Sequence, residues 1–473
     1  MYDRKKHRVV VVEATRVAGG ASGKAGGLLA VWAYPSNIVP LSFKLHQDLA
    51  LEHGGEERWG YRRVLCGNLE AEGRKRSELA GLGPAPGLPL GKRAGDAKKG
   101  GKAWSGSGLP VDLDWILPEL VRGYEKMGGS RETAQVHPYH FTMALMQLAQ
   151  EAGAELVIGS VTEINSADPV SPASTPPPPP PPPPPRPPPP PSSSSSPPPP
   201  PSPPPPPPRP PPSSSSPPPP PPPPPLQPSP PPAPSSLFAA AGRTAGNKSP
   251  SASSLALSAS SRSRRKVESV TYRDKDGRLV TLPVTHAILA AGPWTARLFP
   301  RVPIAGLRAH SVTITPAYPV SGYALFTEIT IPSTPEARYP GPVSPEIYAR
   351  PNNEIYVCGE GDVDVDVPET TADVQVDEAR CDDLIAQVSS VSDHIRLGRV
   401  TRKQACYLPV LSIGGSGGPL IGETGTDGLY LASGHSCWGI NNAPATGLLL
   451  AEMIFDGKTK SADIRQLDPR RIM

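Results

Sequence analysis

A turn that carries glycine, histidine and tryptophan lies near the end of the chain, at residues 434–447. It follows a strand predicted at residues 428–433 and leads into a helix predicted from about residue 444 to 455. The unpaired N–H groups and the positive dipole end of such a helix stabilise an anion. The turn is therefore predicted to bind a group that carries or gains negative charge. An ordinary strand–turn–helix connection is the alternative interpretation.

A carboxylate ends the first apolar run of the chain. Residues 9–12 are all valine, and Glu13 follows them directly. Such a run is typical of a strand buried in a parallel sheet, and in a Rossmann unit the acid that ends the second strand accepts hydrogen bonds from a ribose. A small-residue loop at residues 19–27 follows, where the backbone can come close to a ligand. We therefore predict that Glu13 contacts a nucleotide, with a solvated strand boundary as the alternative.

The third candidate segment is a glycine that ends a predicted buried strand in the second half of the chain. Residues 286–291 are mostly apolar and lead into Gly292, Pro293 and Trp294. A glycine at this place suits a chain that passes close to a bound dinucleotide, because a side chain would collide with it. A simple turn before Pro293 is the alternative.

Taken in their order along the chain, these segments resemble those of the FAD-dependent D-amino-acid oxidase superfamily. Within it, the resemblance is to glycine and sarcosine oxidases and their fungal relatives. The resemblance rests on the Glu13 strand with its glycine loop, the strand that bears Val161, the Gly292 segment and the turn at residues 434–447. It implies FAD as the cofactor, and hydride removal from the carbon next to an amine nitrogen. In that family oxygen commonly reoxidises the flavin.

The resemblance also implies a set of cofactor-binding residues. Glu13 would hold the adenosine ribose and Val161 would lie against the adenine, while Ser22 and Gly27 would line the approach to the pyrophosphate or flavin. Gly434, His435 and Gly439 would surround the flavin ring. The full predicted set is Glu13, Ala14, Ser22, Gly26, Gly27, Val161, Gly292, Trp294, Gly434, His435, Trp438, Gly439 and Ile440.

The sequence departs from the family pattern in three places. The Gly-x-Gly-x-x-Gly turn is expected upstream of residue 1, so we interpret the sequence as truncated at its N-terminus. The Leu-Arg-Pro step that clamps a substrate carboxylate in many members corresponds to Tyr407-Leu408-Pro409. A free α-amino-acid substrate is therefore doubtful unless Arg350 or Arg308 supplies the charge. A basic residue inside the glycine–histidine motif of sarcosine-type relatives is replaced by Cys437 and Trp438.

Cys406 lies where some sarcosine-type relatives attach FAD through a thioether. A buried, inert thiol is the favoured interpretation, and covalent attachment is the alternative. No acid or base can be named as catalytic from the sequence, because the chemistry of such a site rests mainly on the flavin and on substrate alignment.

The predicted fold class is α/β (α+β). It combines a Rossmann-like FAD-binding domain, without its first strand and glycine loop, with a mostly antiparallel substrate domain and a long disordered proline-rich insertion. Of the 71 prolines, most lie between residues 176 and 234, where they cannot build a core. The predicted FAD-binding segments are residues 1–60, 131–166, 266–300 and 411–473. The predicted substrate segments are residues 61–130 and 301–410, and the first of them contains a surface excursion at 67–110. The insertion is predicted at residues 167–265.

Composition narrows the function classes. The net charge of +4 and the absence of a recognisable motif argue against nucleic-acid binding, and the five cysteines show no metal-type spacing. No apolar run is long enough to span a bilayer, so we expect a cytoplasmic protein, with endosome association left open. Proline followed by Arg186 or Arg209 fits SH3 or WW domains, although tolerated low complexity is the simpler interpretation.

The sequence therefore predicts an FAD-dependent oxidoreductase that acts on a small-molecule amine or amino-acid-like substrate. The alternative is a catalytically degenerate member of the fold that serves binding or endosomal trafficking, with the proline-rich tract as a docking arm. An NAD-linked dehydrogenase is disfavoured because the turn at residues 434–447 has no counterpart role there. No metal is predicted.

Overall fold

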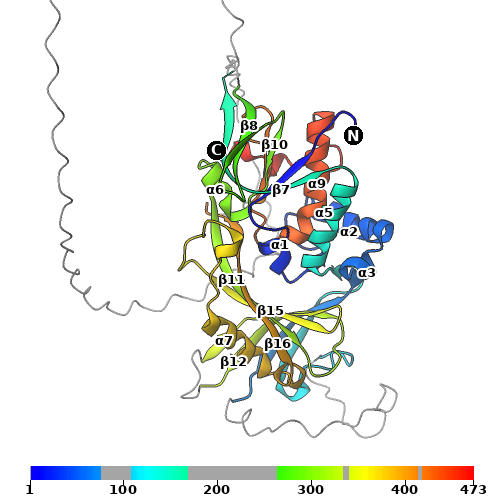
Figure 1. Ribbon diagram of the computed structural model, residues 1–473. Helices are drawn as coiled ribbons and strands as arrows, with labels where there is room; N and C mark the ends of the chain where they lie inside the picture. The colour runs from blue at the N-terminus through cyan, green and yellow to red at the C-terminus, as the bar shows by residue number, and fades with distance from the viewer. Residues whose placement is uncertain (1, 76–107, 169–263, 334–339, 414–417) are drawn as a thin grey trace, which may run out of the picture. The chain divides into compact units, whose positions relative to one another are not determined.

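The computed structural model describes residues 2–75, 108–168, 264–333, 340–413 and 418–473 (Figure 1). The proline-rich insertion and its predicted SH3 or WW contacts lie almost wholly outside these ranges, so those predictions stay open. Among the described residues, no helix is long and apolar enough to cross a membrane.

The largest sheet has eight strands in the order β16-β11-β15-β14-β12-β4-β5, with β13 paired to β12. Its strands are β4 (Leu65–Glu72), β5 (Val121–Gly128), β11 (Ile304–Thr315), β12 (Tyr323–Ile331), β13 (Gly341–Val343), β14 (Glu346–Arg350), β15 (Glu354–Asp362) and β16 (Arg399–Leu411). Every pairing is antiparallel except β12 with β4. The mostly antiparallel substrate domain predicted from the sequence is confirmed.

One face of this sheet is covered by α7 (Glu378–Ser389) and α8 (Asp393–Arg396). The largest hydrophobic cluster lies between these helices and the sheet. It includes Leu384 and Val388 of α7 and Val312 and Ile347 of the sheet. Because side chains alternate along a strand, the residues between these apolar positions face the opposite way. That opposite face carries the polar and aromatic residues of the candidate site.

The prediction of a surface excursion that begins at residue 67 was wrong for its first residues. Residues 65–72 form β4, which lies between β12 and β5 and alternates between buried and exposed side chains. The alternation was hard to see because Gly67, Asn68 and Ala71 are poor strand formers, and pairing on both sides outweighs their weak intrinsic preference. Residues 76–107 lie outside the described residues.

The Rossmann-like strands occur in two separate sheets. In one, β1 (Val10–Glu13) pairs in parallel with β7 (Glu155–Ala167), and β8 (Lys266–Asp274) and β9 (Leu279–Pro283) continue it as an antiparallel meander. In the other, β10 (Ala287–Leu289) pairs in parallel with β18 (Leu429–Ser433), which also pairs with β17 (Leu420–Glu423). Each sheet thus contains one parallel pair, and an isolated parallel bridge between Lys266 of β8 and Asp427, just before β18, links the two sheets.

Helices and a small sheet complete the fold. The small sheet contains β2 (Leu28–Ala30), β6 (Thr133–Gln135) and β3 (Arg62–Arg63). The α-helices are α1 (Ala21–Lys24), α2 (Val39–His53), α3 (Gly55–Trp59), α5 (Pro138–Glu151), α6 (Thr295–Leu298) and α9 (Gly439–Asp456). The 3₁₀ turns are η1 (Pro118–Leu120), η2 (Gly292–Trp294), η3 (Thr371–Asp373), η4 (Ser436–Trp438), η5 (Arg465–Leu467) and η6 (Pro469–Arg471). Figure 1 shows α2, α5 and α9 side by side, and Phe43, Phe141 and Ile440 from these helices share one hydrophobic cluster.

Helix α9 begins earlier than predicted. The sequence suggested a start near Pro444, because proline favours the first turn of a helix, but α9 already begins at Gly439 and contains Pro444 in its interior. The earlier start places the N-terminus of the helix directly after the His435 turn.

Candidate functional site

Glu13 and Val161 lie on neighbouring parallel strands. Glu13 is paired with Ile158 of β7, three residues before Val161. Its carboxylate accepts a hydrogen bond from the backbone N–H of Thr15 at 3.2 Å, and it remains partly exposed, as does Ala14 beside it. The carboxylate is therefore held at the strand end with acceptor capacity to spare, as a ribose-binding acid requires.

The glycine loop packs directly against the eight-stranded sheet. A Cβ built on Gly26 would lie 2.7 Å from the Tyr348 ring, and one on Gly27 would lie 2.1 Å from the carbonyl oxygen of Val136. Ser22 is fixed to α5, since its carbonyl accepts a hydrogen bond from Thr142 Oγ1 at 3.2 Å. The protein's own packing thus requires glycine at residues 26 and 27.

Gly292 and the end of β18 are joined by hydrogen bonds. The carbonyl of Gly292 accepts from Thr295 Oγ1 at 2.6 Å and from Ser433 Oγ at 3.0 Å. A Cβ on Gly292, whose φ is +54°, would meet nothing within 4 Å. The Gly292 turn and the Gly434 turn therefore lie together, with open space above Gly292. Trp294 instead anchors a neighbouring loop, because its Nε1 donates to the carbonyl of Pro368 at 2.6 Å.

His435 is neutral and unsatisfied. Burial lowers the pKa of its imidazole to about 4, and its buried Nδ1 has no hydrogen-bond partner. A Cβ on Gly439, at the start of α9, would come no closer than 3.6 Å to His435. Seven other buried polar atoms of the described residues also lack a partner, but His435 Nδ1 belongs to the turn that leads into the N-terminus of α9. A polar ligand at this turn would satisfy it.

Two asparagines hold this turn in place. Asn441 Oδ1 accepts a hydrogen bond from the N–H of Ala30 at 3.0 Å, and Asn442 Nδ2 donates to the carbonyl of Tyr34 at 3.0 Å. Ile440 is fixed from α2, where His46 Nε2 donates to its carbonyl at 2.9 Å. The start of α9 is thus tied to β2, to the segment after β2, and to α2.

An acidic and aromatic surface was missed by sequence reasoning. On the sheet face opposite α7, Glu346 bonds to the hydroxyl of Tyr348 and to Cys358 Sγ, the latter at 3.7 Å. Trp438 packs against the same cluster as Tyr348 and Tyr356. One signal was available in the sequence: Glu346, Tyr348 and Arg350 alternate with Ile347 and Ala349, which places a carboxylate in a row of otherwise buried side chains.

The chain matches a family model described as "FAD dependent oxidoreductase" over residues 2–175 and 254–453. The chain belongs to this family. It is 33% identical to "Putative oxidoreductase TDA3" of Saccharomyces cerevisiae, with 98% of this chain and 89% of that protein covered. It is 27% identical to "Putative oxidoreductase C1F5.03c" of Schizosaccharomyces pombe, with 99% and 91% covered.

Solved structures share the fold of this FAD-dependent oxidoreductase. Glycine oxidase from Geobacillus kaustophilus matches with a TM-score of 0.54 at 17% identity, covering 99% of this chain and 94% of that one. Iminodiacetate oxidase from Chelativorans sp. BNC1 matches with a TM-score of 0.55 at 14% identity, covering 98% and 94%. The family resemblance and fold class predicted from the sequence are confirmed.

Arg350 lies on the site face of the oxidoreductase, but its donors are used by the protein. Its Nη1 donates to Glu354 at 2.9 Å, Nε donates to the carbonyl of Gly26 at 3.3 Å, and Nη2 donates to the carbonyl of Ala25. Its guanidinium also lies 4.3 Å from the centre of the Tyr356 ring. This arginine therefore pins the glycine loop to the sheet and has little capacity left for a substrate carboxylate.

Arg308 is placed away from that face. It lies in a buried ion pair with Asp362, with 3.0 Å between Nε and Oδ1, and both side chains are at most 6% exposed. His310 and Arg380 also lie near Asp362. The strand register turns Arg308 toward α7, so the substrate role considered for it has no geometric support.

Cys406 lies near Tyr356 and Cys358, within the surroundings of the site. Burial raises the pKa of its thiol to about 11, and nearby Lys24 only partly opposes this. The thiol is therefore protonated and unreactive at neutral pH. The inert thiol stays the favoured prediction, and covalent attachment of FAD stays its alternative.

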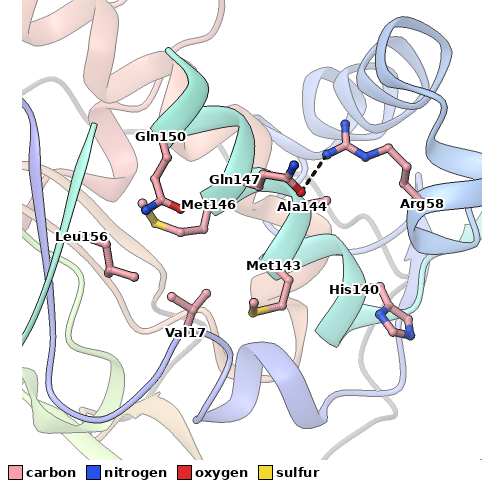
Figure 2. A pocket seen from close by; sticks show the side chains of 9 residues that line it. All are labelled: Val17, Arg58, His140, Met143, Ala144, Met146, Gln147, Gln150 and Leu156. Atoms are coloured by element: carbon pink, nitrogen blue, oxygen red, sulfur yellow. Dashed lines mark hydrogen bonds between the residues drawn. The ribbon is translucent and has the colours of Figure 1, made fainter. Parts of the chain in front are cut away.

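A cavity of about 450 Å³ lies beside α5 (Figure 2). Figure 2 shows Met143 and Met146 reaching into it opposite Val17, with Arg58 bonded to Gln147 at its rim. None of the predicted site residues lines it. The described residues also contain no group of three or more His, Cys, Asp or Glu side chains that could hold a metal ion.

Proposed function

We propose that this FAD-dependent oxidoreductase binds FAD and oxidises a C–N bond of an amine or amino-acid-like compound. The observation that carries the proposal is the neutral His435 ring, unpartnered at Nδ1, in the turn that leads into α9 and whose Trp438 packs against the aromatic sheet face. When bound, FAD supplies the acceptor for the hydride that leaves the carbon next to the nitrogen. Two similar folds belong to enzymes named for oxidising glycine and iminodiacetate, which are both amines.

The residues of the chain have separate parts in this proposal. Glu13 accepts hydrogen bonds from the ribose, and Val161 lies against the adenine. The free N–H groups at Gly439 and Ile440 stabilise negative charge at the pyrimidine end of the flavin. The eight-stranded sheet covers the opposite side of the substrate and excludes water.

Flavin content tests the proposal. The full chain is incubated with FAD, separated from free FAD, and examined for the two visible flavin absorption bands. Amines are then added without oxygen, and loss of the long-wavelength band reports hydride transfer. A protein that carries the glycine turn expected upstream of residue 1 and still stays colourless refutes the proposal and leaves the degenerate, non-catalytic alternative.

A matched pair of variants locates the cofactor. Glu13→Gln removes the carboxylate at the end of β1, and we expect at least about tenfold weaker FAD binding from the loss of a charge-assisted hydrogen bond. Glu268→Gln removes an exposed carboxylate from β8 and leaves FAD binding unchanged. Equal affinities for the two variants would contradict the role assigned to Glu13.

A further inference from the structure

Glu346 occupies the centre of the site face of the eight-stranded sheet. Across the sheet it is paired with Phe326 of β12 on one side and with Cys358 of β15 on the other. It is only partly exposed, and burial raises the pKa of its carboxyl group. Its bonds to Tyr348 and Cys358 fix the carboxyl group in one place.

Within the described chain, no lysine, arginine or histidine forms an ion pair with Glu346. Arg350, two positions beyond Tyr348 on the same strand face, is occupied by Glu354 and by two backbone carbonyls. Lys24 donates to the carbonyl of Ala405 at 2.8 Å. Burial without a counter-charge favours the neutral form of this carboxyl group, and a cation placed beside it would favour the charged form. The position is therefore suited to a cationic partner that arrives from outside.

Aromatic rings lead from Glu346 to the His435 turn. The ring of Phe326 lies 6.2 Å from that of Trp32, which lies 5.5 Å from Trp438, and Tyr34 lies 6.2 Å from Trp438. Trp32 is 36% exposed and Tyr34 is 49% exposed, which is unusual for rings packed against one another. These rings therefore keep surface free for contact with a ligand.

The Trp438 ring joins the His435 turn to this sheet face. It packs against the hydrophobic cluster that contains Tyr348 and Tyr356, as does Phe326. Burial, and after it the charge of Glu346, raises the pKa of the neighbouring Cys437 thiol. The sheet face that carries Glu346 thus lies against the turn at which, in the proposed function, the flavin ring lies.

We propose that Glu346, together with the rings of Phe326, Trp32 and Trp438, binds the positively charged amine group of the substrate. The substrate class is then a secondary or tertiary amine that binds as its cation and whose binding requires no α-carboxylate. A carboxylate attracts an ammonium group by charge, and aromatic faces attract it through their quadrupole. The same carboxylate repels an anionic substrate group, and Arg350, whose side chain is only 3% exposed, already donates to Glu354 and to two backbone carbonyls.

This inference rests on the proposed function, but its test can be separated from it. Tetramethylammonium, a cation whose nitrogen has no lone pair to assist hydride loss from an adjacent carbon, is titrated into the full chain at constant ionic strength while tryptophan fluorescence is followed. Flavin absorbance is recorded on the same samples. A colourless protein that still binds the cation refutes the proposed function alone, whereas a yellow protein that does not bind it refutes this inference alone.

Two glutamate variants decide the role of the carboxylate. Glu346→Gln keeps the shape of the side chain and removes the charge, and we expect about tenfold weaker binding of tetramethylammonium. Glu328→Gln removes an exposed charge from β12, two residues beyond Phe326, and leaves binding unchanged. Equal binding by Glu346→Gln and the wild-type protein, with equal melting temperatures, overturns the proposal.

Two further measurements test the proposal if the Glu346→Gln variant does not fold. Tyr348→Phe removes the hydroxyl that bonds to Glu346 and leaves the ring in place, and a measurable loss of cation binding is expected. Acetate is titrated into the wild-type protein under the same conditions. Saturable binding of acetate in place of tetramethylammonium overturns the proposal, because it would mean that the site selects an anion.

Discussion

The imidazole Nε2 of His46 lies 2.9 Å from the carbonyl oxygen of Ile440, the carbonyl that Pro444 leaves without its helical partner. Proline has no N–H, so α9 cannot form the bond from residue 444 back to residue 440. His46 is fully buried, on α2, and supplies the missing donor. A helix–helix contact therefore completes the first turns of the helix whose N-terminus forms the candidate site.

A double-mutant cycle tests this arrangement. His46→Phe leaves the Ile440 carbonyl buried without a donor, and we expect a loss of about 1–3 kcal/mol in the free energy of unfolding. In the Pro444→Ala background, residue 444 supplies its own N–H, so the same substitution should cost clearly less. Urea unfolding of the four proteins measures the coupling. Equal costs in both backgrounds would show that His46 acts through packing alone.

Acid should destabilise the protein before its carboxylates titrate. Burial lowers the pKa of both His46 and His435 from 6.5 to about 4, so the unfolded chain binds protons more tightly than the folded one. Their contribution to stability is complete above pH 6.5 and is lost as pH falls toward 4, on the order of 3 kcal/mol for each. Unfolding free energies at several pH values measure the slope, and His435→Gln should reduce it. The slope should not vanish, since the pKa values of His140, His310 and His394 are lowered as well.

Arg308 should matter for stability and not for ligand binding. Arg308→Met leaves the buried Asp362 carboxylate with weaker partners, and we expect a loss of about 3 kcal/mol in the free energy of unfolding. Binding of tetramethylammonium and of FAD should stay within twofold of the wild-type values, roughly the scatter of non-additive effects. A selective loss of ligand binding without a loss of stability would show that Arg308 contributes to the ligand-binding site.

The glycine loop should tolerate no side chain. Gly27→Ala combines a φ of +93° with a Cβ only 2.1 Å from the Val136 carbonyl oxygen, and we expect a loss of more than about 2 kcal/mol. Gly447→Ala is the matched control, because a Cβ there meets nothing within 4 Å inside helix α9, and a gain of about 0.5–1 kcal/mol is expected. Thermal unfolding of both variants checks the opposite signs.

The sequence by itself determined the segments that make the fold. Four consecutive valines before Glu13 indicated β1, an Asp-Gly turn indicated the hairpin of β8 and β9, and the glycine–histidine turn indicated a following helix, although not its start at Gly439. These are local signals, since strand periodicity, turn residues and helix termini are encoded within a few neighbouring residues. The family resemblance rested on the order of such segments.

Only the tertiary structure decided which side chains share a surface. Arg308 and Arg350 looked equally suitable in the sequence, but pairing with Asp362 turned one toward α7 while the other was bound by the glycine loop. Glu346 belongs to the candidate site because the pairing of β14 with β12 and β15 places Phe326 and Cys358 beside it. Contacts of this kind join residues far apart in the chain, and their register is set by the packing of the whole sheet, which no local pattern records.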